Sequence, residues 1–349
     1  MLLTDIPRAA WVISAVNRGF GMLTFDYAAF SGITTDIRLG RRGAQTLRVG
    51  FDLSIDTHSF FYSREECPAF VPDCYEPHLS TSAAASGSTV QTTNLQVIQQ
   101  YTDELYIGED GYIETFRFNL VVKSRPSSLK NREVAGVLGG AIFENTEISL
   151  KENMEAGTLN IFVRDLSRSN PFQPDSGVVS IASSHITRWE FPSEITMHSV
   201  DNESSPDVLF RGVVSFVPGF QDVAISRSRI GEFQSILRKH GVVGDVINGR
   251  AFIECIFGSI SNSAFSLSLQ LTPTELINLS TGQLSLSPRE NIRTELIQSH
   301  NGVQLVCPTR LLFDSDIPEN RVLIGRVLTR SVDAVYLDYG NRNIRFGLV

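Results

Sequence analysis

Alternation of apolar and polar residues runs through most of the chain and predicts β-strands. Residues 31–39 alternate and are rich in Ile and Thr, a glycine-bounded break follows at 40–43, and residues 46–51 predict the next strand. Residues 97–107 and 112–122 flank an Asp-Gly pair, which is typical of a hairpin turn. Further strands are predicted at 159–163, 178–182, 194–197, 322–328 and 334–337.

Helical periodicity is confined to two short segments. In residues 227–240 the apolar side chains recur at helical spacing, and Gly241 is a natural stop. These side chains, which share one face, are Ile230, Phe233, Ile236 and Leu237. Residues 288–299 are a second, shorter helix candidate. The predicted class is therefore all-β: mostly β with a few short helices.

Glycine-rich segments suggest two halves with a similar plan. Each half holds a strand that leads into a polar turn and is followed later by an apolar segment with glycine, VAGVLGGA at 134–141 and VLIGRVL at 322–328. Glycine within a strand indicates that another element packs close to the backbone. Residues 80–93 are a Ser/Ala/Gly/Thr tract without apolar period, which we interpret as an exposed connection.

Composition adds the size of the core and the sign of the charge. The chain has 349 residues, of which 42% are hydrophobic and 19% charged, so it can bury two cores. Its formal charge of −8 argues against a nucleic-acid partner, because such binding rests on neutralising phosphates. The densest basic cluster, Arg38 with Arg41 and Arg42, is interpreted as a solvated turn.

Four cysteines bear on the compartment. Their spacing indicates two local pairs, Cys67 with Cys74 and Cys255 with Cys307, although four cysteines allow three pairings. None stands in a zinc-type CxxC pair, and we predict no metal. Disulfides imply an oxidising compartment, so we expect a secreted or secretory-lumen protein.

The sequence start and two sequons bear on the same point. Asp5, Pro7 and Arg8 stand where a signal peptide should be apolar, so we expect no signal peptide in this sequence. Asn202 and Asn278 begin glycosylation sequons, NES and NLS, which predict a glycoprotein. No apolar run reaches the roughly 20 residues that a membrane span requires, and we predict none.

The order of these features resembles the pepsin-like aspartic proteases from about Phe30 onward. ITTDIRLGRRGAQTLRVGFD is similar to that family's opening strands, which end on the first catalytic aspartate. CPAFVPDC and the following YEPHLSTSAA resemble its small disulfide loop and the run after it. GVLGG resembles its apolar-apolar-Gly segment. The ending LIGRVLTRSVDAVYLDYGNRNIRFGLV resembles the family's I-L-G-D-x-F-L-R and N-x-R-I-G-F-A ending.

The resemblance implies a bilobal fold with a central cleft. The N-terminal lobe would span residues 1–185 and the C-terminal lobe residues 186–349. Cys255 and Cys307 would form the disulfide of the second lobe. Tyr101 would be the tyrosine of the flap that covers the substrate groove; the alternative is an ordinary cross-strand aromatic.

The family's chemistry needs two aspartates that share one proton, each in an Asp-Thr/Ser-Gly turn. The first turn here reads Asp52-Leu53-Ser54, which keeps the acid and loses the hydroxyl and the glycine. Asp52 is therefore either a vestigial catalytic acid or a turn acid that caps backbone amides. A shifted alternative, beginning at Asp56, puts His58 where the glycine should be.

The second turn lacks its acid. Counting back from the predicted helix at 227–240 places the second aspartate at Pro218, which has no acid. Asp222 is the nearest carboxylate, four residues further on. Asp175, in a literal Asp-Ser-Gly, comes too early for this turn and better fits a strand at the lobe junction.

We therefore predict a pseudoprotease that binds a protein or peptide through its cleft or surface loops, without a cofactor. The alternative is an active, divergent aspartic endopeptidase that hydrolyses peptide bonds at acidic pH with Asp52 and Asp222. The six histidines show no paired metal-ligand spacing, and neither a GxSxG elbow nor a phosphate-binding glycine loop occurs.

Overall fold

Strands make up most of the computed structural model, in agreement with the predicted all-β class. The structure describes residues 11–17, 33–55, 58–68, 71–87, 89–91, 97–107, 111–123, 134–143, 146–153, 158–166, 177–198, 205–256, 259–260, 265–286, 294–299 and 302–348. The α-helices within these ranges are α1 (Ile230–Lys239) and α2 (Thr281–Leu284). No helix in the described part of the chain has the length and apolar character that crossing a bilayer requires.

The chain divides into two compact units. Unit 1 comprises Met1–Gln173 and Tyr336–Asn343, and unit 2 comprises Pro174–Val335 and Ile344–Val349. The lobe boundary between residues 185 and 186, which the resemblance implies, remains a prediction.

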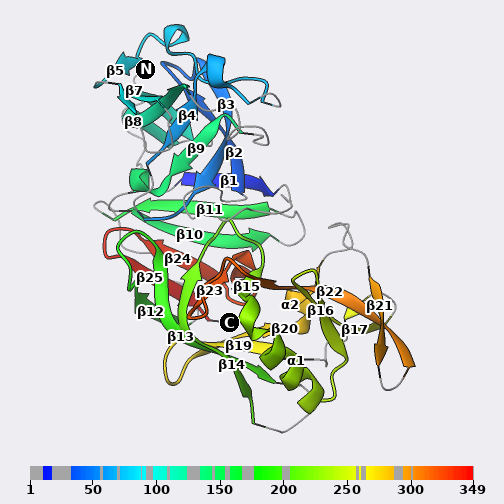
Figure 1. Ribbon diagram of the computed structural model, residues 1–349. Helices are drawn as coiled ribbons and strands as arrows, with labels where there is room; N and C mark the ends of the chain where they lie inside the picture. Colours follow the sequence, from blue (N-terminus) through cyan, green and yellow to red (C-terminus); the bar gives the residue numbers. More distant parts are fainter. Residues whose placement is uncertain are drawn as a thin grey trace. The chain divides into compact units, whose positions relative to one another are not determined.

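Unit 1 is built on one strongly hydrogen-bonded sheet. Its described strands run in the order β10-β11-β1-β2-β3-β9-β4-β8-β7-β5, and Figure 1 labels these strands. Strand β6 pairs with β7. Their bounds are β1 (Trp11–Asn17), β2 (Ile33–Leu39), β3 (Gln45–Asp52), β4 (Phe60–Tyr62), β5 (Ala84–Ala85), β6 (Val90–Gln91), β7 (Val97–Ile107), β8 (Gly111–Lys123), β9 (Gly136–Gly139), β10 (Thr146–Asn153) and β11 (Thr158–Asp165). The predicted hairpin of residues 97–107 and 112–122 is confirmed as β7 and β8.

Aromatic side chains fill the core of unit 1. The Phe61 ring lies 5.0 Å from that of Phe118 and 6.1 Å from that of Phe116, both edge to face. The Tyr75 ring lies 5.1 Å from Phe118, also edge to face. All four are buried, and such ring pairs add to the free energy gained from burying their area.

Unit 2 has its own sheet, in the order β16-β17-β22-β15-β23-β14-β13-β19-β20; β18 pairs with β17 and β21 with β22. The described strands of this sheet are β13 (Trp189–His198), β14 (Asp207–Phe216), β15 (Val223–Ser226), β16 (Gly244–Ile247), β17 (Arg250–Ile256), β18 (Ser259–Ile260), β19 (Ser266–Gln270), β20 (Leu276–Ser280), β21 (Glu295–Ser299), β22 (Gly302–Asp314) and β23 (Arg321–Ile324). Strand β12 (Val178–Ala182) lies outside this sheet and pairs with β25. The remaining strands, β24 (Ala334–Asp338) and β25 (Asn343–Gly347), stand at the end of the chain, where it passes through unit 1 and back.

The helix predicted at residues 227–240 is confirmed, and the helix predicted at residues 288–299 is wrong over its described residues. Helix α1 follows a 3₁₀ turn at Arg227–Arg229 and buries Phe233, whose ring lies 5.2 Å from that of Phe313. It ends before Gly241, whose φ of 68° is favoured by glycine. Of the predicted helix at 288–299, residues 295–299 form strand β21, and residues 288–293 lie outside the described part.

The two units repeat one arrangement of four strands. In unit 1, β3 pairs parallel with β9, β9 antiparallel with β4, and β4 parallel with β8. In unit 2, β14 pairs parallel with β23, β23 antiparallel with β15, and β15 parallel with β22. In unit 1 the segment from β3 to β4 passes next to the glycine pair at the end of β9, and in unit 2 the turn from β14 to β15 passes next to Gly325 after β23. These two turns are the candidate positions for functional side chains.

Candidate functional site

The turn of unit 1 begins at Asp52, the last residue of β3. Asp52 pairs with Gly139 of β9 and is 8% exposed. Its Oδ1 accepts a hydrogen bond from the Ser54 amide at 2.9 Å, which is the geometry of an acid that closes its own turn. The side chains of Leu53 and Ile55 are buried, so an apolar residue packs where the resemblance calls for a hydroxyl.

Three further contacts hold this turn. The Gly139 amide donates to Ser59 Oγ at 2.9 Å, and Tyr339 Oη donates to the Leu53 carbonyl at 2.8 Å. A Cβ on Gly140 would overlap the carbonyl oxygen of Ser54. The backbone at Leu53 and Ser54 is therefore fixed by its surroundings as well as by Asp52.

The corresponding turn of unit 2 contains Pro218. The Phe220 amide donates to the Val217 carbonyl at 2.9 Å, so Pro218 occupies the second position of a β-turn, where its fixed φ is favourable. Pro218 and Phe220 are buried. The Phe220 carbonyl accepts the Arg326 amide at 2.7 Å and would be overlapped by a Cβ on Gly325.

Two structural counts give the residue of unit 2 that corresponds to Asp52. By strand register, Asp52 pairs with the residue before Gly140, and Phe216 pairs with the residue before Gly325. By glycine contact, the overlapped carbonyl lies two residues after Asp52 in unit 1 and two residues after Pro218 in unit 2. The counterpart thus falls between Phe216 and Pro218, and this Phe-Val-Pro segment contains no carboxylate.

Asp222, the nearest acid, is held by two arginines of its own unit. Arg250 Nη2 donates to its Oδ2 and Arg310 Nη1 to its Oδ1, both at 3.2 Å. Arg310 also donates to Gln221 Oε1, and Arg250 Nη1 to the Thr309 carbonyl at 2.6 Å. Since Asp222 is 9% exposed and Arg310 1%, this is a largely buried ion-pair cluster in which both carboxylate oxygens are occupied.

Tyr101 lies within β7, opposite Phe118 of β8 and Ala85 of β5. Its ring stacks on that of Phe118 at 6.2 Å and lies 6.5 Å from the Tyr75 ring. The side chain is half-buried. These contacts belong to a cross-strand aromatic cluster, and a role of Tyr101 in covering a groove remains a prediction.

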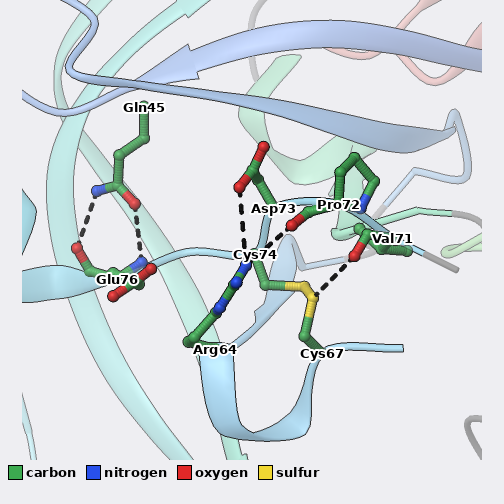
Figure 2. The surroundings of a disulfide bond; sticks show 8 residues. All are labelled: Gln45, Arg64, Cys67, Val71, Pro72, Asp73, Cys74 and Glu76. Carbon is green, nitrogen blue, oxygen red and sulfur yellow. Dashed lines mark hydrogen bonds and ion pairs between the residues drawn. A yellow bond between two sulfur atoms is a disulfide. The ribbon is translucent and has the colours of Figure 1, made fainter. Parts of the chain in front are cut away.

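Both predicted disulfides are confirmed. Cys255 pairs with Cys307, and Cys67 pairs with Cys74 (Figure 2). Figure 2 also shows Arg64, whose Nη1 donates to the Pro72 carbonyl within the small disulfide loop at 2.9 Å. The disulfide closes the loop, and the Arg64 hydrogen bond ties its Pro72 carbonyl to the 3₁₀ turn at Arg64–Glu66.

A buried carboxylate that the sequence analysis missed lies at Asp103 of β7. Its oxygens accept hydrogen bonds from Tyr75 Oη at 2.6 Å, Ser80 Oγ at 2.9 Å, Ser82 Oγ at 2.6 Å and the Glu104 amide at 2.8 Å. Burial, together with the hydrogen bond to Asp103, raises the pKa of the Tyr75 phenol well above its ordinary value. Three of the four donors belong to residues 75–82, so Asp103 fastens this segment to β7.

Of the two predicted sequons, one can be placed. Asn278 is exposed on β20, and its Oδ1 accepts a hydrogen bond from Ser268 Oγ at 2.6 Å. Ser280, the third residue of this sequon, caps α2 through a capping box with Gln283. Asn202 lies outside the described residues.

The remaining candidates do not assemble into a site. Among the described residues no three His, Cys, Asp or Glu side chains are grouped as metal ligands. His240 Nε2, at the C-terminal end of α1, lies 2.8 Å from Asp207 Oδ2 of β14. His198 Nε2 of β13 lies 2.7 Å from Ser266 Oγ of β19. Asp56 and Asp175 lie outside the described residues.

Neither the models of known protein families nor the sequences of curated proteins match this chain. Its function is therefore argued from the strand arrangement and the side chains at the two turns.

Proposed function

We propose that this chain is a pepsin-like pseudoprotease: a protein with the bilobal aspartic-protease fold that does not hydrolyse peptide bonds and binds a protein or peptide instead. The fold part of the proposal is supported by the four-strand arrangement that occurs once in each unit. It is supported also by the sequence resemblance, in which a glycine segment follows each turn.

The observation that carries the loss of activity is the difference between the two turns. Unit 1 presents Asp52 at the end of β3, whereas the segment from Phe216 to Pro218 at the end of β14 has no acid. Aspartic-protease chemistry divides acid and base roles between two carboxylates that share a proton. With one carboxylate absent, neither the shared proton nor the division of roles is available.

The alternative, an active endopeptidase that uses Asp222, is disfavoured by the contacts of that residue. Its two oxygens receive hydrogen bonds from Arg250 and Arg310. Both carboxylate oxygens of Asp222 are therefore occupied by donors of its own unit. Freeing Asp222 would leave two arginines of the unit without this partner, at a large cost in free energy.

The compartment and the modification belong to the same proposal. The two disulfides are typical of chains that mature in an oxidising environment. A secreted or secretory-lumen chain would meet glycosyltransferases, and the exposed Asn278 offers them an accessible side chain.

The test is hydrolysis of a mixed peptide library by the full chain between pH 3 and 7, with and without a pepstatin-type inhibitor. We expect no inhibitor-sensitive cleavage at any pH. The matched variants are Asp52→Asn and, as a control for a general loss of charge, Asp36→Asn, which alters an exposed acid on β2.

Cleavage that pepstatin blocks and that Asp52→Asn abolishes while Asp36→Asn preserves it would refute the pseudoprotease proposal. The same result with Asp222→Asn would identify the second acid of the alternative.

A further inference from the structure

The turn between β2 and β3 gathers three exposed arginines, Arg38, Arg41 and Arg42, within five residues. It is closed by a hydrogen bond from the Gly43 amide to the Gly40 carbonyl at 2.7 Å. Both glycines have positive φ, 69° and 92°, so the tight course of the turn is built into the sequence.

Tyr106 of β7 lies beneath this turn and positions two of the arginines. The guanidinium carbon of Arg38 stands 5.5 Å from the centre of the Tyr106 ring, within the range of a cation–π contact. The Arg42 amide donates to Tyr106 Oη at 3.2 Å, while Tyr106 Oη donates to Glu104 Oε2 at 2.9 Å. The Tyr112 ring packs 4.9 Å from that of Tyr106 and supports it.

The charge of the turn is not neutralised by its neighbours. Among the described residues, none of the ion pairs involves Arg38, Arg41 or Arg42. The carboxylate of Glu104 accepts a hydrogen bond from Tyr106, and Asp36 stands opposite Arg48 in the pairing of β2 with β3. In a chain with a formal charge of −8, this turn is a local positive field.

We propose that this arginine turn, residues 38–42 on Tyr106, binds a sulfated polysaccharide. Guanidinium groups match the oxygen geometry of sulfate as they match phosphate, and three of them on a fixed turn suit a chain of repeated anions. A nucleic acid offers the same anion chemistry through its phosphates, and its binding is an outcome of the test. The two disulfides favour an oxidising compartment, where sulfated glycans are the common polyanions.

The experiment measures the Kd of the full chain for a sulfated heparin hexasaccharide at physiological salt, by calorimetry, with the desulfated hexasaccharide in parallel. The test variant carries Arg38→Gln, Arg41→Gln and Arg42→Asn. Asparagine is chosen because Arg42 has a φ of 61°, which asparagine tolerates. We expect sulfate-dependent binding whose Kd rises about tenfold or more in the variant.

The matched control removes the same charge elsewhere, through Arg117→Gln, Arg227→Gln and Arg342→Asn. All three arginines are exposed, and Arg342 shares the positive φ of Arg42, at 54°. We expect this control to bind like the unchanged chain. Circular dichroism of both variants checks that they are folded.

Three results would overturn the proposal. The first is no binding of the sulfated hexasaccharide by the unchanged chain, and the second is an equal loss in the test and control variants. The third is binding of a polyglutamate peptide or of single-stranded DNA as tight as that of the hexasaccharide, which would show a surface without preference for sulfated sugars. None of these results bears on hydrolysis, so the proposal stands or falls independently of the proposed function.

Discussion

Single residues at the two turns carry most of the functional argument, and their neighbours explain why each is tolerated. Asp52 is satisfied by its own turn, through the bond from the Ser54 amide. Pro218 fits the second position of its turn, where no amide hydrogen is needed. Each turn is packed against a glycine, Gly140 in unit 1 and Gly325 in unit 2, which brings the backbones into contact.

Gly140→Ala is expected to destabilise the protein by about 1–3 kcal/mol, because the added methyl group overlaps the Ser54 carbonyl and the turn must shift. The matched control is Gly231→Ala in α1, where a Cβ meets nothing within 4 Å. There alanine should stabilise by about 0.5–1 kcal/mol through its lower backbone entropy. Denaturant unfolding measures both, and equal effects of the two substitutions would contradict the close approach at Gly140.

At the scale of elements, helix α1 is fastened to the start of β14 through Asp207. Lys239 Nζ donates to its two oxygens at 2.7 and 2.8 Å, and His240 Nε2 lies 2.8 Å from Oδ2. The hydrogen bond from Lys239, with that from His240, holds the pKa of the Asp207 carboxyl below its ordinary value. The contact therefore stabilises the fold only while the carboxyl is ionised.

Asp207→Asn should lower the free energy of unfolding by about 0.5–1 kcal/mol at pH 7, the range for partly exposed ion pairs. Because the pKa of Asp207 is lower in the folded chain than in the unfolded chain, its ion pair stabilises the fold at a pH above the unfolded-state pKa. This stabilisation is lost as the pH falls through the folded-state pKa. The difference between the unchanged chain and the variant should thus shrink below about pH 4. Urea unfolding from pH 7 to pH 3 measures it; a difference that stays constant would exclude the ionic contribution.

The two disulfides close loops of very different length, with sequence separations of 7 and 52. On the chain-entropy account, replacing Cys255 and Cys307 with serine should cost about 4 kcal/mol, and replacing Cys67 and Cys74 about 2.5 kcal/mol. Unfolding of the two double variants under the same denaturant gives the comparison. The reverse order would show that local packing, and not loop length, governs their contribution.

Elements were predictable from the sequence where their pattern is local. Residues 97–107 show their alternation, and residues 227–240 their apolar face, without reference to any other part of the chain. These segments form β7 and α1. Residues 295–299 have no strong pattern of their own. They form β21 because β22 pairs with them along its N-terminal part, a tertiary influence that overrides local propensity.

The site was predictable to the same extent. Asp52 ends an apolar strand and is visible in one short segment. The arginines that occupy Asp222 come from positions 28 and 88 residues away, and the donors to Asp103 on Tyr75, Ser80 and Ser82 come from 21 to 28 residues away. Contacts at such separations leave no periodic trace, so only the folded chain reveals that both carboxylates are already satisfied.

At the scale of the whole molecule, the end of the chain serves both units. Residues 336–343 belong to unit 1, where Tyr339 bonds the Leu53 carbonyl. Residues 344–349 belong to unit 2, where the Phe346 ring lies 5.9 Å from that of Phe191. The stability of each unit is therefore linked to the same short segment.

Deleting residues 336–349 should raise amide hydrogen exchange in both units, because each loses buried side chains. Deleting only residues 344–349 should raise it in unit 2 and leave the strands around Asp52 protected. Exchange measured by mass spectrometry resolves the two units. Unchanged protection of β3 and β9 in the longer deletion would show that unit 1 does not need its C-terminal segment.

This return of the chain has a consequence for biosynthesis. The polypeptide is made from its N-terminus, so unit 1 emerges from the ribosome long before Tyr339, which completes the turn at Asp52. Unit 1 therefore stays incomplete until residues 336–343 have been translated. Chaperones that bind exposed strand edges would act on unit 1 until then. A premature stop codon shortly before residue 336 would remove the C-terminal segment of both units.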